Sequence, residues 1–487
     1  MGLDELKDER LRKLKELVRA NIDPYPAKSW RSHTIKQALE NFDDLSGQKA
    51  TVVLAGRVMA MRAHGAITFA DINDGSSTIQ TLFNTEHLSD REYELLTSTL
   101  DIGDFLEVQG PLFLTKRNER TVEVLKWRML AKATRPLPEK WHGLVDVEER
   151  YRRRYLDLIF NDDVKKRFEM RFRIISSMRK FFAEHGYQEV ETPILQVKPG
   201  GATARPFATH MNDLDIDLYL RVAPELYLKR LLVGGFERVF EIGKNFRNEG
   251  MDREHNPEFT MLEAYAAYKD HEWLMGLVED LILELVTEVF GKPELDYEGT
   301  VISLKKPFRR IPFADIIKQY AGLEYDLADT DDFVRKANEL GIQVEKAWTK
   351  AVLADEIYKK VARPLMMEPV FVVNHPLELS PLSKKSAPDS TTVARFQLLM
   401  AGMELCNAFS ELNDPQDQRV RFEEQEKQRQ AGSEEAQRLD EDFIEALEYG
   451  MPPAAGIGIG VDRLVALLTG AHSLRDVLLF PTMKPNA

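Results

Sequence analysis

The sequence contains very little cysteine and no long apolar run. Cys406 is its single cysteine among 487 residues, which excludes an internal disulfide and fits a reducing compartment. No stretch of about eighteen or more apolar residues occurs, so no membrane-spanning helix is expected. Residues 1–20 are charged throughout and lack the apolar core of a signal peptide. These absences predict a cytoplasmic protein that does not enter a membrane.

Two common phosphate-binding patterns are also missing. The glycine-rich run "GIGIGVDR" at residues 456–463 fits neither the Walker pattern nor G-x-G-x-x-G, which disfavours P-loop and Rossmann sites. Its glycines occupy alternate positions of a predicted strand, where a flat ligand could approach the backbone closely. A tightly packed core strand would show the same pattern. The formal net charge of −14 argues against a non-specific nucleic-acid coat, but a localised basic face remains compatible with it.

The length allows two or three domains, and composition changes suggest where they divide. Residues 1–28 are predicted as an N-terminal amphipathic helix, ended by the two prolines of "NIDPYPAK". Residues 29–140 contain about five alternating or β-branched runs, the last at 120–132, which predicts a small barrel such as the oligonucleotide-binding (OB) fold. Residues 141–160 are predicted as a linker. Residues 161–487 are predicted as a second domain of mixed strands and helices, with a helical insertion near 300–370.

The stretch "FRNEGMDREHNPEFTMLEAY" concentrates charged and hydrogen-bonding residues between two predicted strands. Because side chains alternate between the faces of a strand, one surface of this hairpin collects a guanidinium, two carboxylates, an aromatic ring and a phenol. A solvated face with one ion pair, worth about 0–1 kcal/mol, would explain a single Arg–Glu pair but not this combination. We interpret the surface as a site for an anionic, aromatic ligand that also carries a cation. The residues that share it are Arg247, Glu249, Phe259, Glu263 and Tyr265.

Two further segments supply complementary groups. "MELCNAFSELND" at 403–414 carries Glu404, and alternation places Asn407 and Glu411 on one face. "VKPGGATARPF" at 197–207 is a glycine-rich loop that could offer backbone carbonyls to an amine. The three segments together predict one binding site assembled from distant parts of the chain.

Over nearly its whole length the sequence resembles the class II lysyl-tRNA synthetases of bacterial type. The resemblance rests on the three class II signatures in order, and "KPGGATARPF" with "HNPEFT" favours the lysine enzymes over their aspartate and asparagine relatives. The other matching stretches are "RPLPEKWHGL", "RYLDLI", "EVETPIL", "LRVAPELYLKRLLVGGFERVFEIGKNFRNEG", "ELCNAFSELNDP", "GIGIGVDRL" and "RDVLLFPTMKP".

The resemblance implies an α+β fold, with a class II catalytic domain (an antiparallel sheet flanked by helices) and an N-terminal OB-fold barrel. It also implies a homodimer with Pro193 at the interface. The implied reaction joins L-lysine and ATP into lysyl-adenylate and then transfers lysine to the 3′ end of tRNA(Lys), with Mg²⁺ as the cofactor and ATP as a substrate.

The resemblance carries roles over to individual residues, with Arg247 and Arg463 as the catalytic pair. Glu411 and Tyr265 would take the ε-ammonium of lysine; a neutral side chain would leave the buried carboxylate unpaired, at a cost of about 3–5 kcal/mol. The residues implied for ATP are Arg247, Glu249, His255, Asn256, Phe259, Glu404 and Arg463. Those implied for lysine are Gly201, Glu225, Arg247, Glu263, Tyr265, Asn407 and Glu411.

In the barrel, the resemblance implies recognition of a uridine-rich anticodon. An aromatic ring that stacks a base and polar groups that read its edge are what single-stranded RNA recognition needs. Phe69 could alternatively be a core residue of the barrel. The matching positions are Arg62, Phe69, Gln80 and Glu119.

The sequence departs from the family at one of its two magnesium positions. Glu404 matches, but Gln397 stands in an "RFQ" context where family members generally have glutamate. An amide oxygen can ligate a hard cation but adds no charge, so weaker magnesium binding is expected. Two smaller departures are Met211, where a histidine is usual, and Ala66, where a lysine is usual.

Two other functions are compatible with parts of the pattern. One is a synthetase-like paralogue that transfers lysine to a protein or another acceptor that is not tRNA; the barrel argues against it, and a lipid-modifying version would be expected to carry membrane helices. The other is a catalytically inactive RNA-binding relative. Four residues expected in the active enzymes argue against it, namely Arg247, Glu249, Glu404 and Arg463.

The departure at position 397 generates the first prediction. Gln397→Glu should lower the magnesium concentration needed for half-maximal lysine activation, because it restores the negative charge that family members generally carry at this position. Magnesium titrations of lysine-dependent ATP–pyrophosphate exchange measure this. An ordinary magnesium requirement that the substitution leaves unchanged contradicts the prediction.

Overall fold

The computed structural model describes residues 2–138, 146–345, 348–387, 390–430 and 438–485. The chain divides into two compact units, Met1–Val145 and Asp146–Ala487. Each unit has its own hydrophobic core. Within the described ranges, no helix combines the length and the apolar character needed to cross a membrane.

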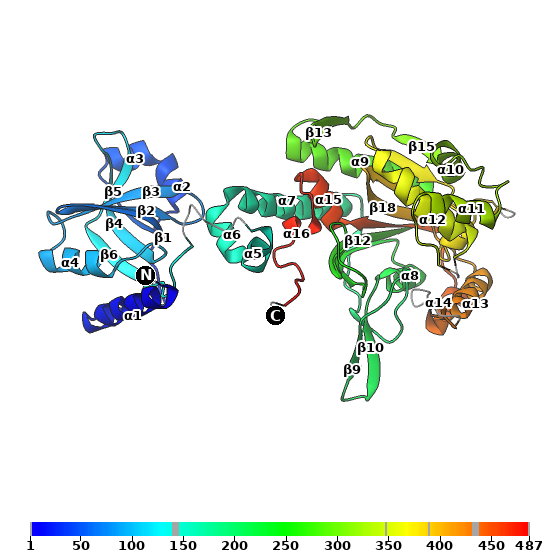
Figure 1. Ribbon diagram of the computed structural model, residues 1–487, viewed down its shortest axis with the longest axis horizontal. Coiled ribbons are helices and arrows are strands. Elements are labelled where there is room, and N and C mark those ends of the chain that lie inside the picture. The colour runs from blue at the N-terminus through cyan, green and yellow to red at the C-terminus, as the bar shows by residue number, and fades with distance from the viewer. Residues whose placement is uncertain (1, 139–145, 346–347, 388–389, 431–437, 486–487) are drawn as a thin grey trace. The chain divides into compact units, whose positions relative to one another are not determined.

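The first unit is a six-stranded barrel with four helices (Figure 1). Its sheet has the order β1-β2-β3-β5-β4-β6, and β1 also pairs with β4. The helices are α1 (Leu3–Arg19), α2 (Ile35–Glu40), α3 (Phe42–Gly47) and α4 (Asp90–Thr99). The strands are β1 (Thr51–His64), β2 (Ile67–Asn73), β3 (Thr78–Asn84), β4 (Phe105–Leu114), β5 (Arg120–Glu123) and β6 (Lys126–Ala131).

The barrel closes because β1 is long enough to pair on both sides. Its first half pairs with β4 and its second half with β2, and Arg57 has a partner on both sides. A register shift between Val58 and Ala60 interrupts the pairing with β2. Alternate residues of β1 such as Val52 and Leu54 are fully buried, as the period-two pattern predicts. At Gly110 a Cβ would lie 1.7 Å from the Glu123 carbonyl oxygen, so the close approach of β4 to β5 requires glycine.

The N-terminal helix spans Leu3–Arg19 rather than the predicted residues 1–28, and the last predicted strand is divided in two. Helix α1 buries Leu17 in the barrel core, so it belongs to this unit. Residues 120–132, predicted as one strand, form two: β5 pairs with β3 and β4, and β6 pairs with β4 alone. The chain leaves the sheet between them, where Leu125 N–H donates to the Gln109 carbonyl.

A buried ion cluster joins the end of β6 to the turn before β4. The Lys132 ammonium lies 2.8 Å from Asp104 Oδ2 and 2.5 Å from Asp101 Oδ2, and both Lys132 and Asp104 side chains are fully buried. Burial raises the pKa of Asp104, although Lys132 opposes the shift. Lys13 of α1 reaches Asp101 at 2.8 Å and ties the helix to the same cluster.

The second unit is built on an eight-stranded sheet with the order β15-β16-β17-β18-β19-β12-β11-β7. All pairings are antiparallel except β15–β16 and β11–β7 at the two edges. Its strands are β7 (Gln188–Glu189), β11 (Arg238–Phe246), β12 (Glu258–Ala267), β15 (Arg309–Pro312), β16 (Val370–Val373), β17 (Arg395–Met400), β18 (Met403–Ser410) and β19 (Ala454–Gly460).

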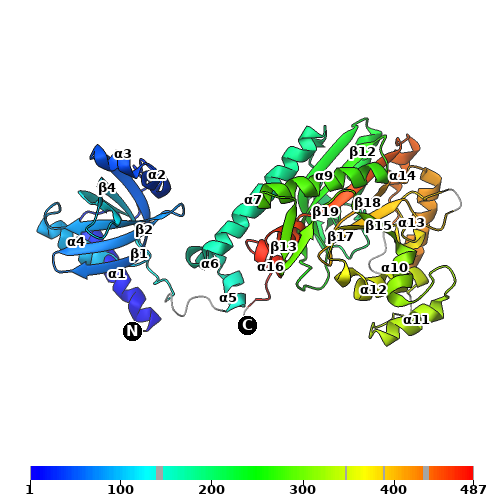
Figure 2. The same cartoon turned by 90° about the horizontal axis from the view of Figure 1, so that it is seen from above.

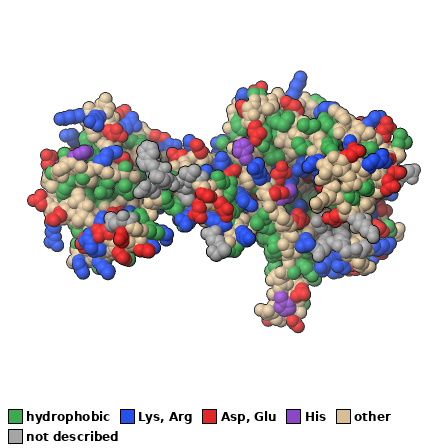
Figure 3. Space-filling model, viewed as in Figure 1, with side chains coloured by type: hydrophobic (Ala, Val, Ile, Leu, Met, Phe, Trp, Pro, Cys, Tyr) green, Lys and Arg blue, Asp and Glu red, His purple; other side chains and the backbone are tan. Residues whose placement is uncertain are grey.

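Two small sheets accompany the large one. One has the order β8-β10-β9, and its strands β9 and β10 form a hairpin that projects from the unit (Figures 1 and 3). The other is a two-stranded ribbon, β13–β14. Their strands are β8 (Leu195–Gln196), β9 (Ala208–Met211), β10 (Ile216–Leu220), β13 (Glu294–Tyr297) and β14 (Thr300–Ser303).

Helices cover one face of the large sheet, where α7 and α9 run across it (Figure 2). The longer helices are α7 (Asp162–Glu184), α8 (Glu225–Val233), α9 (His271–Phe290), α10 (Phe313–Ala321), α11 (Thr330–Glu339), α12 (Lys350–Val361), α13 (Pro415–Gln430), α14 (Glu441–Glu448) and α15 (Val461–Leu468). The shorter ones are α5 (Val147–Arg152), α6 (Arg154–Phe160), α16 (Leu474–Val477) and the 3-10 turns η1 (Arg363–Leu365) and η2 (Leu377–Leu379).

The two faces of the sheet have opposite character because side chains alternate. In β12, Leu262 and Ala264 lie in the core beneath α7 and α9. Their neighbours Met261, Glu263 and Tyr265 point to the other face, as the sequence predicted. The helices therefore bury one face and leave the other free to build a pocket.

The structure differs from the predicted domain boundaries in two places. Residues 146–160, predicted as part of a linker, form α5 and α6 in the second unit, and residues 141–145 lie outside the described ranges. Arg154 holds these two helices against the rest of the second unit. It is buried, pairs with Asp157 at 2.6 Å, and donates to the Arg475 carbonyl. The region 300–370, predicted as a helical insertion, also contains β14 and β15, and its helices begin only at Phe313.

The ion cluster of the barrel generates a stability prediction. Lys132→Met should lower the free energy of unfolding of the first unit by about 3–5 kcal/mol, because it leaves the buried Asp104 carboxylate without its cation. Chemical denaturation followed by hydrogen exchange of barrel amides measures this. Lys13→Met is the control: it leaves Lys132 in place and should cost clearly less. Equal losses for the two variants would contradict the assignment of Lys132 as the main counter-ion.

Candidate active site

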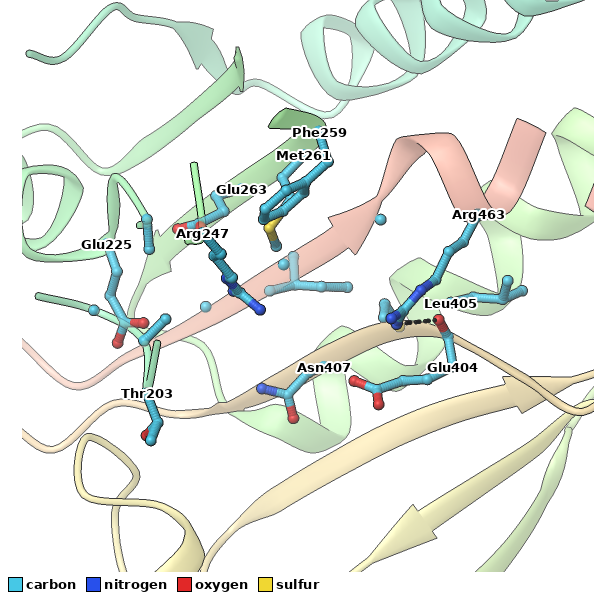
Figure 4. Close-up of a pocket in the computed structure, with 18 of the residues that line it drawn as sticks. Thr203, Glu225, Arg247, Phe259, Met261, Glu263, Glu404, Leu405, Asn407 and Arg463 are labelled. Carbon is cyan, nitrogen blue, oxygen red and sulfur yellow. Dashed lines mark hydrogen bonds between the residues drawn. The ribbon is translucent and has the colours of Figure 1, made fainter. Parts of the chain in front are cut away.

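A cavity of about 350 Å³ lies on the open face of the large sheet. Its floor comes from β12, β18 and β19, and its walls come from the loop after β11, the start of α8, the segment around Leu379–Ser383 and the start of α15. Figure 4 shows Arg247 near its middle, with Glu225 and Glu263 toward one end and Arg463 with Glu404 toward the other. The cavity therefore has one acidic end and one end that contains both signs of charge.

Strand pairing explains why these residues meet. In the hairpin β11–β12, Asn245 pairs with Phe259 and Glu241 with Glu263. The pairing continues beyond β11, since Arg247 N–H donates to the Pro257 carbonyl at 2.9 Å. As a result, Arg247 stands over the Phe259 ring, with its guanidinium carbon 5.0 Å from the ring centroid.

Arg247 is prepared to bind an anion. Its side chain points into the cavity (Figure 4), and its Nε is buried with no hydrogen-bond partner among the described residues. Burial lowers its pKa, although Glu249 opposes the shift; a guanidinium stays charged in proteins nonetheless. A carboxylate or phosphate would satisfy both its charge and its donors.

The opposite end of the cavity gathers donors around Arg463. Its Nη2 lies 3.3 Å from His255 Nε2, and its Nη1 donates to the Glu404 carbonyl at 3.4 Å (Figure 4). His255 is held in turn by Asp252, 2.9 Å from its Nδ1. Asn256 donates to the Glu258 carbonyl at 2.6 Å, so its side chain braces the turn before β12. Donors and cations at this end suit a polyphosphate.

Asp462, which the sequence analysis did not select, fixes the position of Arg463. Its Oδ2 accepts from Thr260 N–H at 2.8 Å, and its Oδ1 pairs with Arg171 of α7 at 2.6 Å. This buried bridge ties the first turn of α15 to β12, beside Phe259. The signal in the sequence is an acidic residue in the first turn of a helix, which by itself indicates only a favourable interaction with the helix dipole.

The acidic end contains three buried carboxylates. Glu225 is 6% exposed, Glu263 4% and Glu411 1%. Burial raises the pKa of Glu263 to about 8 and of Glu411 to about 8, and it raises the pKa of Glu225 as well. The Tyr265 hydroxyl donates to Glu263 Oε2 at 3.0 Å. A ligand with ammonium groups would stabilise the ionised carboxylates, because it supplies the missing positive charge.

Glycines keep this end open. At Gly456 a Cβ would lie 2.2 Å from Glu411 Oε1 and 2.4 Å from Tyr265 Cε1, so only glycine leaves room for those side chains. Gly456 pairs with Tyr265 and Gly458 with Glu263 across β12–β19. Gly201 has a φ of +89°, and its Cβ would lie 2.9 Å from the Glu225 Cβ, so this loop also requires glycine.

The structure brings together almost all of the residues selected from the sequence. Two of them are not part of the cavity wall itself: Glu411, which lies behind Gly456, and Gln397. Asn407 lines the cavity, and its Oδ1 accepts from Arg395 Nε at 2.7 Å. Arg395 and Lys229 were not selected from the sequence. Lys229 follows Glu225 by four residues on a helix, a spacing that indicates an ion pair but not its burial.

Gln397 is not part of the cavity wall. Its Oε1 accepts from the Tyr358 hydroxyl at 3.2 Å and lies 3.2 Å from His375 Nε2. No cluster of three or more His, Cys, Asp or Glu within the described ranges is arranged to hold a metal. Glu404 lines the cavity and fits Mg²⁺, which commonly binds through one or two carboxylates and substrate phosphates. Gln397 as a ligand stays a prediction.

In the barrel, three of the four predicted anticodon residues share one face. Arg62 pairs with Phe69 across β1–β2, and Asp71 pairs with Gln80 across β2–β3. Phe69 is half-buried and lies outside the hydrophobic core, unlike its neighbour Ala70. The face thus combines a ring with polar groups. Glu119 is exposed in the loop before β5.

Hydrogen bonds within this face already occupy some of the groups that could bind a nucleic acid. Arg62 Nη2 donates to Asp71 Oδ1 at 3.0 Å, and Gln80 Oε1 accepts from the Thr121 hydroxyl at 3.0 Å. The first pair lies on an exposed surface, where such interactions are weak and readily exchanged. A nucleic-acid ligand could therefore compete for the guanidinium.

Comparison with known proteins agrees with this geometry. Residues 146–484 match the family described as tRNA synthetases class II (D, K and N), and residues 52–130 match the OB-fold nucleic acid binding domain. The chain is similar to the lysine–tRNA ligase of Pelotomaculum thermopropionicum, with 50% identity over 99% of this chain and 96% of that relative. It is also similar to the ligase of Syntrophomonas wolfei, with 48% identity over 100% of this chain and 98% of that relative.

The fold and the site thus define a class II aminoacyl-tRNA synthetase with an OB-fold domain. With full-length relatives near half identity, the chain belongs to the lysine–tRNA ligase family within that class.

The glycines of β19 generate a prediction about the acidic end. Gly456→Ala should lower the affinity for lysine at least about tenfold, because its methyl group would displace Glu411 and Tyr265. Gly460→Ala is the matched control: the nearest atom to its Cβ would lie 3.7 Å away, in ordinary contact. Equilibrium binding of lysine and of ATP measures both variants. Unchanged lysine affinity in Gly456→Ala would show that this end does not hold the amino acid.

Proposed function

We propose that the protein is an ATP-dependent lysine–tRNA ligase that forms lysyl-adenylate and transfers lysine to the 3′ end of tRNA(Lys). The observation that carries the proposal is the buried carboxylate of Glu411. Its Oε1 has no hydrogen-bond partner among the described residues, and it lies beside Tyr265 in a socket that also contains Glu225 and Glu263. An ammonium group at the end of a long aliphatic chain would satisfy this oxygen.

The distribution of charge orients both substrates. Arg247, between the two ends of the cavity, would bind the lysine carboxylate and the α-phosphate together, so that nucleophile and electrophile meet at one guanidinium. Glu249 would accept from the adenine amine, and Phe259 with Arg463 would hold the base. Asn407 would assist the carboxylate, and His255 with Asn256 would lie near the phosphates.

The first step needs no general base. The lysine carboxylate is already ionised and attacks the α-phosphorus, while pyrophosphate leaves with the electrons of the broken P–O bond. Acceleration then comes from positioning and from neutralising charge, the two contributions that dominate phosphoryl chemistry. Mg²⁺, held by Glu404 and the triphosphate, would supply additional neutralisation of phosphate oxygens.

Selectivity follows from the acidic end. Gly201 through its carbonyl, with Glu225 and Glu263, would take the α-ammonium, and Glu411 with Tyr265 would take the ε-ammonium. A neutral side chain of similar length would leave the Glu411 carboxylate uncompensated, and an unpaired buried charge costs about 3–5 kcal/mol. This penalty favours lysine over leucine or methionine.

The barrel and the surface of the second unit support the partners of this proposal. Arg62, Phe69 and Gln80 would bind the anticodon, with Glu119 on the adjoining loop. A homodimer is proposed on the exposed apolar side chains of α7 and the following segment, where Phe172 is 52% exposed and Ile194 44%. A cytoplasmic location completes the proposal, since tRNA and ATP are found there.

The two alternative functions fit the structure less well. A ligase that lysylates a protein or another acceptor would not need the anticodon-binding face around Phe69. An inactive RNA-binding relative would not need a Glu411 carboxylate oxygen without a hydrogen-bond partner, or the Arg247 guanidinium that points into the cavity.

Lysine-dependent ATP–pyrophosphate exchange, followed by charging of tRNA transcripts with and without the uridine-rich anticodon, tests the proposal. Glu411→Gln should lower kcat/KM for lysine by about 10²–10³-fold, because the amide cannot balance the ε-ammonium. The KM for ATP should change little. Glu445→Gln, an exposed carboxylate of α14, is the matched control and should behave as wild type.

Each outcome discriminates between the candidates. Exchange without charging would favour the paralogue that uses another acceptor. The absence of both exchange and charging would favour the inactive relative. Exchange that depends on a neutral amino acid rather than lysine would overturn the assignment of Glu411.

A further inference from the structure

The amino-acid end of the cavity already contains a cation of the chain itself. Lys229 of α8 is fully buried, and its ammonium lies 2.6 Å from Glu225 Oε1 and 2.5 Å from Glu411 Oε2. One internal ammonium thus bridges the two carboxylates assigned to the opposite ammonium groups of the substrate. The reaction outlined above does not use it.

Lys229 remains charged in this environment. Burial by itself would lower its pKa, but Glu225 and Glu411 outweigh that effect and the pKa is raised. Its ammonium also lies 5.5 Å from the Phe409 ring centroid, within the range of a cation–π contact. The Lys229 ammonium, paired with Glu225 and Glu411, therefore places a positive charge behind the socket.

The charges around the socket can be counted from every element that packs against it. Helix α8 supplies Glu225 and Lys229, β12 supplies Glu263 and Tyr265, and the residue after β18 is Glu411. The Tyr265 hydroxyl stays neutral, because burial raises its pKa well above the usual value. Beside these groups, Arg247 faces the cavity, and Arg221 is engaged by Glu241 at 2.5 Å. Arg395 of β17 and Glu404 of β18 also line the cavity, and their opposite charges offset each other.

With all three carboxylates ionised, Lys229 reduces the socket's charge from −3 to −2. L-Lysine brings two ammonium groups, and its carboxylate is matched by Arg247. The bound site is then electrically balanced, which a buried cluster requires because uncompensated charge is costly in a low-dielectric interior. A neutral or monocationic amino acid would leave at least one carboxylate without a partner.

We propose that Lys229 is a specificity-determining positioning residue, a fixed counter-ion that holds Glu225 and Glu411 and leaves the socket short of two positive charges. This inference rests on the proposed function, since it takes lysine as the substrate. It goes beyond that function because Lys229 acts through the two glutamates and does not itself touch the substrate.

Three substitutions separate the charge of Lys229 from its bulk. Lys229→Met keeps the length and removes the charge, Lys229→Arg keeps the charge, and Lys229→Ala makes room for an added cation. Lys229→Met should raise the KM for lysine at least about tenfold and the KM for ATP less than about twofold. Lys229→Arg should retain more lysine binding than Lys229→Met. Ethylammonium should restore lysine binding to Lys229→Ala, and ethanol, its neutral analogue, should not.

Lys359→Met provides the matched control. Lys359 also pairs with a carboxylate four residues away, Asp355 of α12, at 2.7 Å, but it lies outside the cavity. Its loss should leave both KM values unchanged. ATP binding by each variant reports separately whether the second unit is folded.

The outcomes distinguish the inference from the proposed function. Absence of lysine binding in the wild type would overturn the function itself. Normal lysine KM in Lys229→Met, or equal rescue of Lys229→Ala by ethylammonium and ethanol, would overturn the counter-ion role alone. Loss of ATP binding in both uncharged variants without rescue by ethylammonium would also overturn it, because Lys229 would then serve the fold rather than the socket.

Discussion

The burial of carboxylates at one end of the cavity is the constraint on which the site depends. Glu263 and Glu411 are almost completely enclosed, and this burial raises the pKa of each to about 8. Such groups are tolerated only when positive charge compensates them. Lys229 supplies part of that charge, and an ammonium-bearing ligand supplies the rest. Affinity and selectivity therefore arise from one electrostatic requirement.

The central sheet makes this burial possible because one of its faces packs against helices and the other lines the cavity. Helices α7, α9 and α15 cover one face with apolar contacts. On the other face, the glycines of β19 lie opposite the long side chains of β12, so that Gly456 leaves room for Tyr265 and Gly458 for Met261. Rigid strands carry the reactive groups, and the bridge from Arg171 to Asp462 extends that rigidity to the start of α15. Positioning, which this chemistry relies on, thus comes from the core itself.

Much of this arrangement could be predicted from local patterns. Strand alternation placed Phe259, Glu263 and Tyr265 on one face, and the structure confirms that face. The barrel and the long helix at 162–184 were also predictable, because period-two and three-to-four-residue spacings are strong signals. Domain edges were harder: residues 146–160 look like a linker by composition, yet a buried Arg154 binds them to the second unit.

The sequence by itself determined most strands and helices and which of their faces are polar. Through the resemblance of its motifs, it also indicated the class of chemistry. Only the tertiary structure decided which charged groups are buried together. In the sequence, Lys229 looks like an ordinary i,i+4 ion-pair partner of Glu225. Gln397 looks like a weak magnesium ligand that adds no charge. In the fold, Lys229 is enclosed between Glu225 and Glu411, and the Gln397 amide is engaged by Tyr358. Burial is the physical reason for the difference, because the strength of an electrostatic contact depends on how much water the rest of the chain excludes from it.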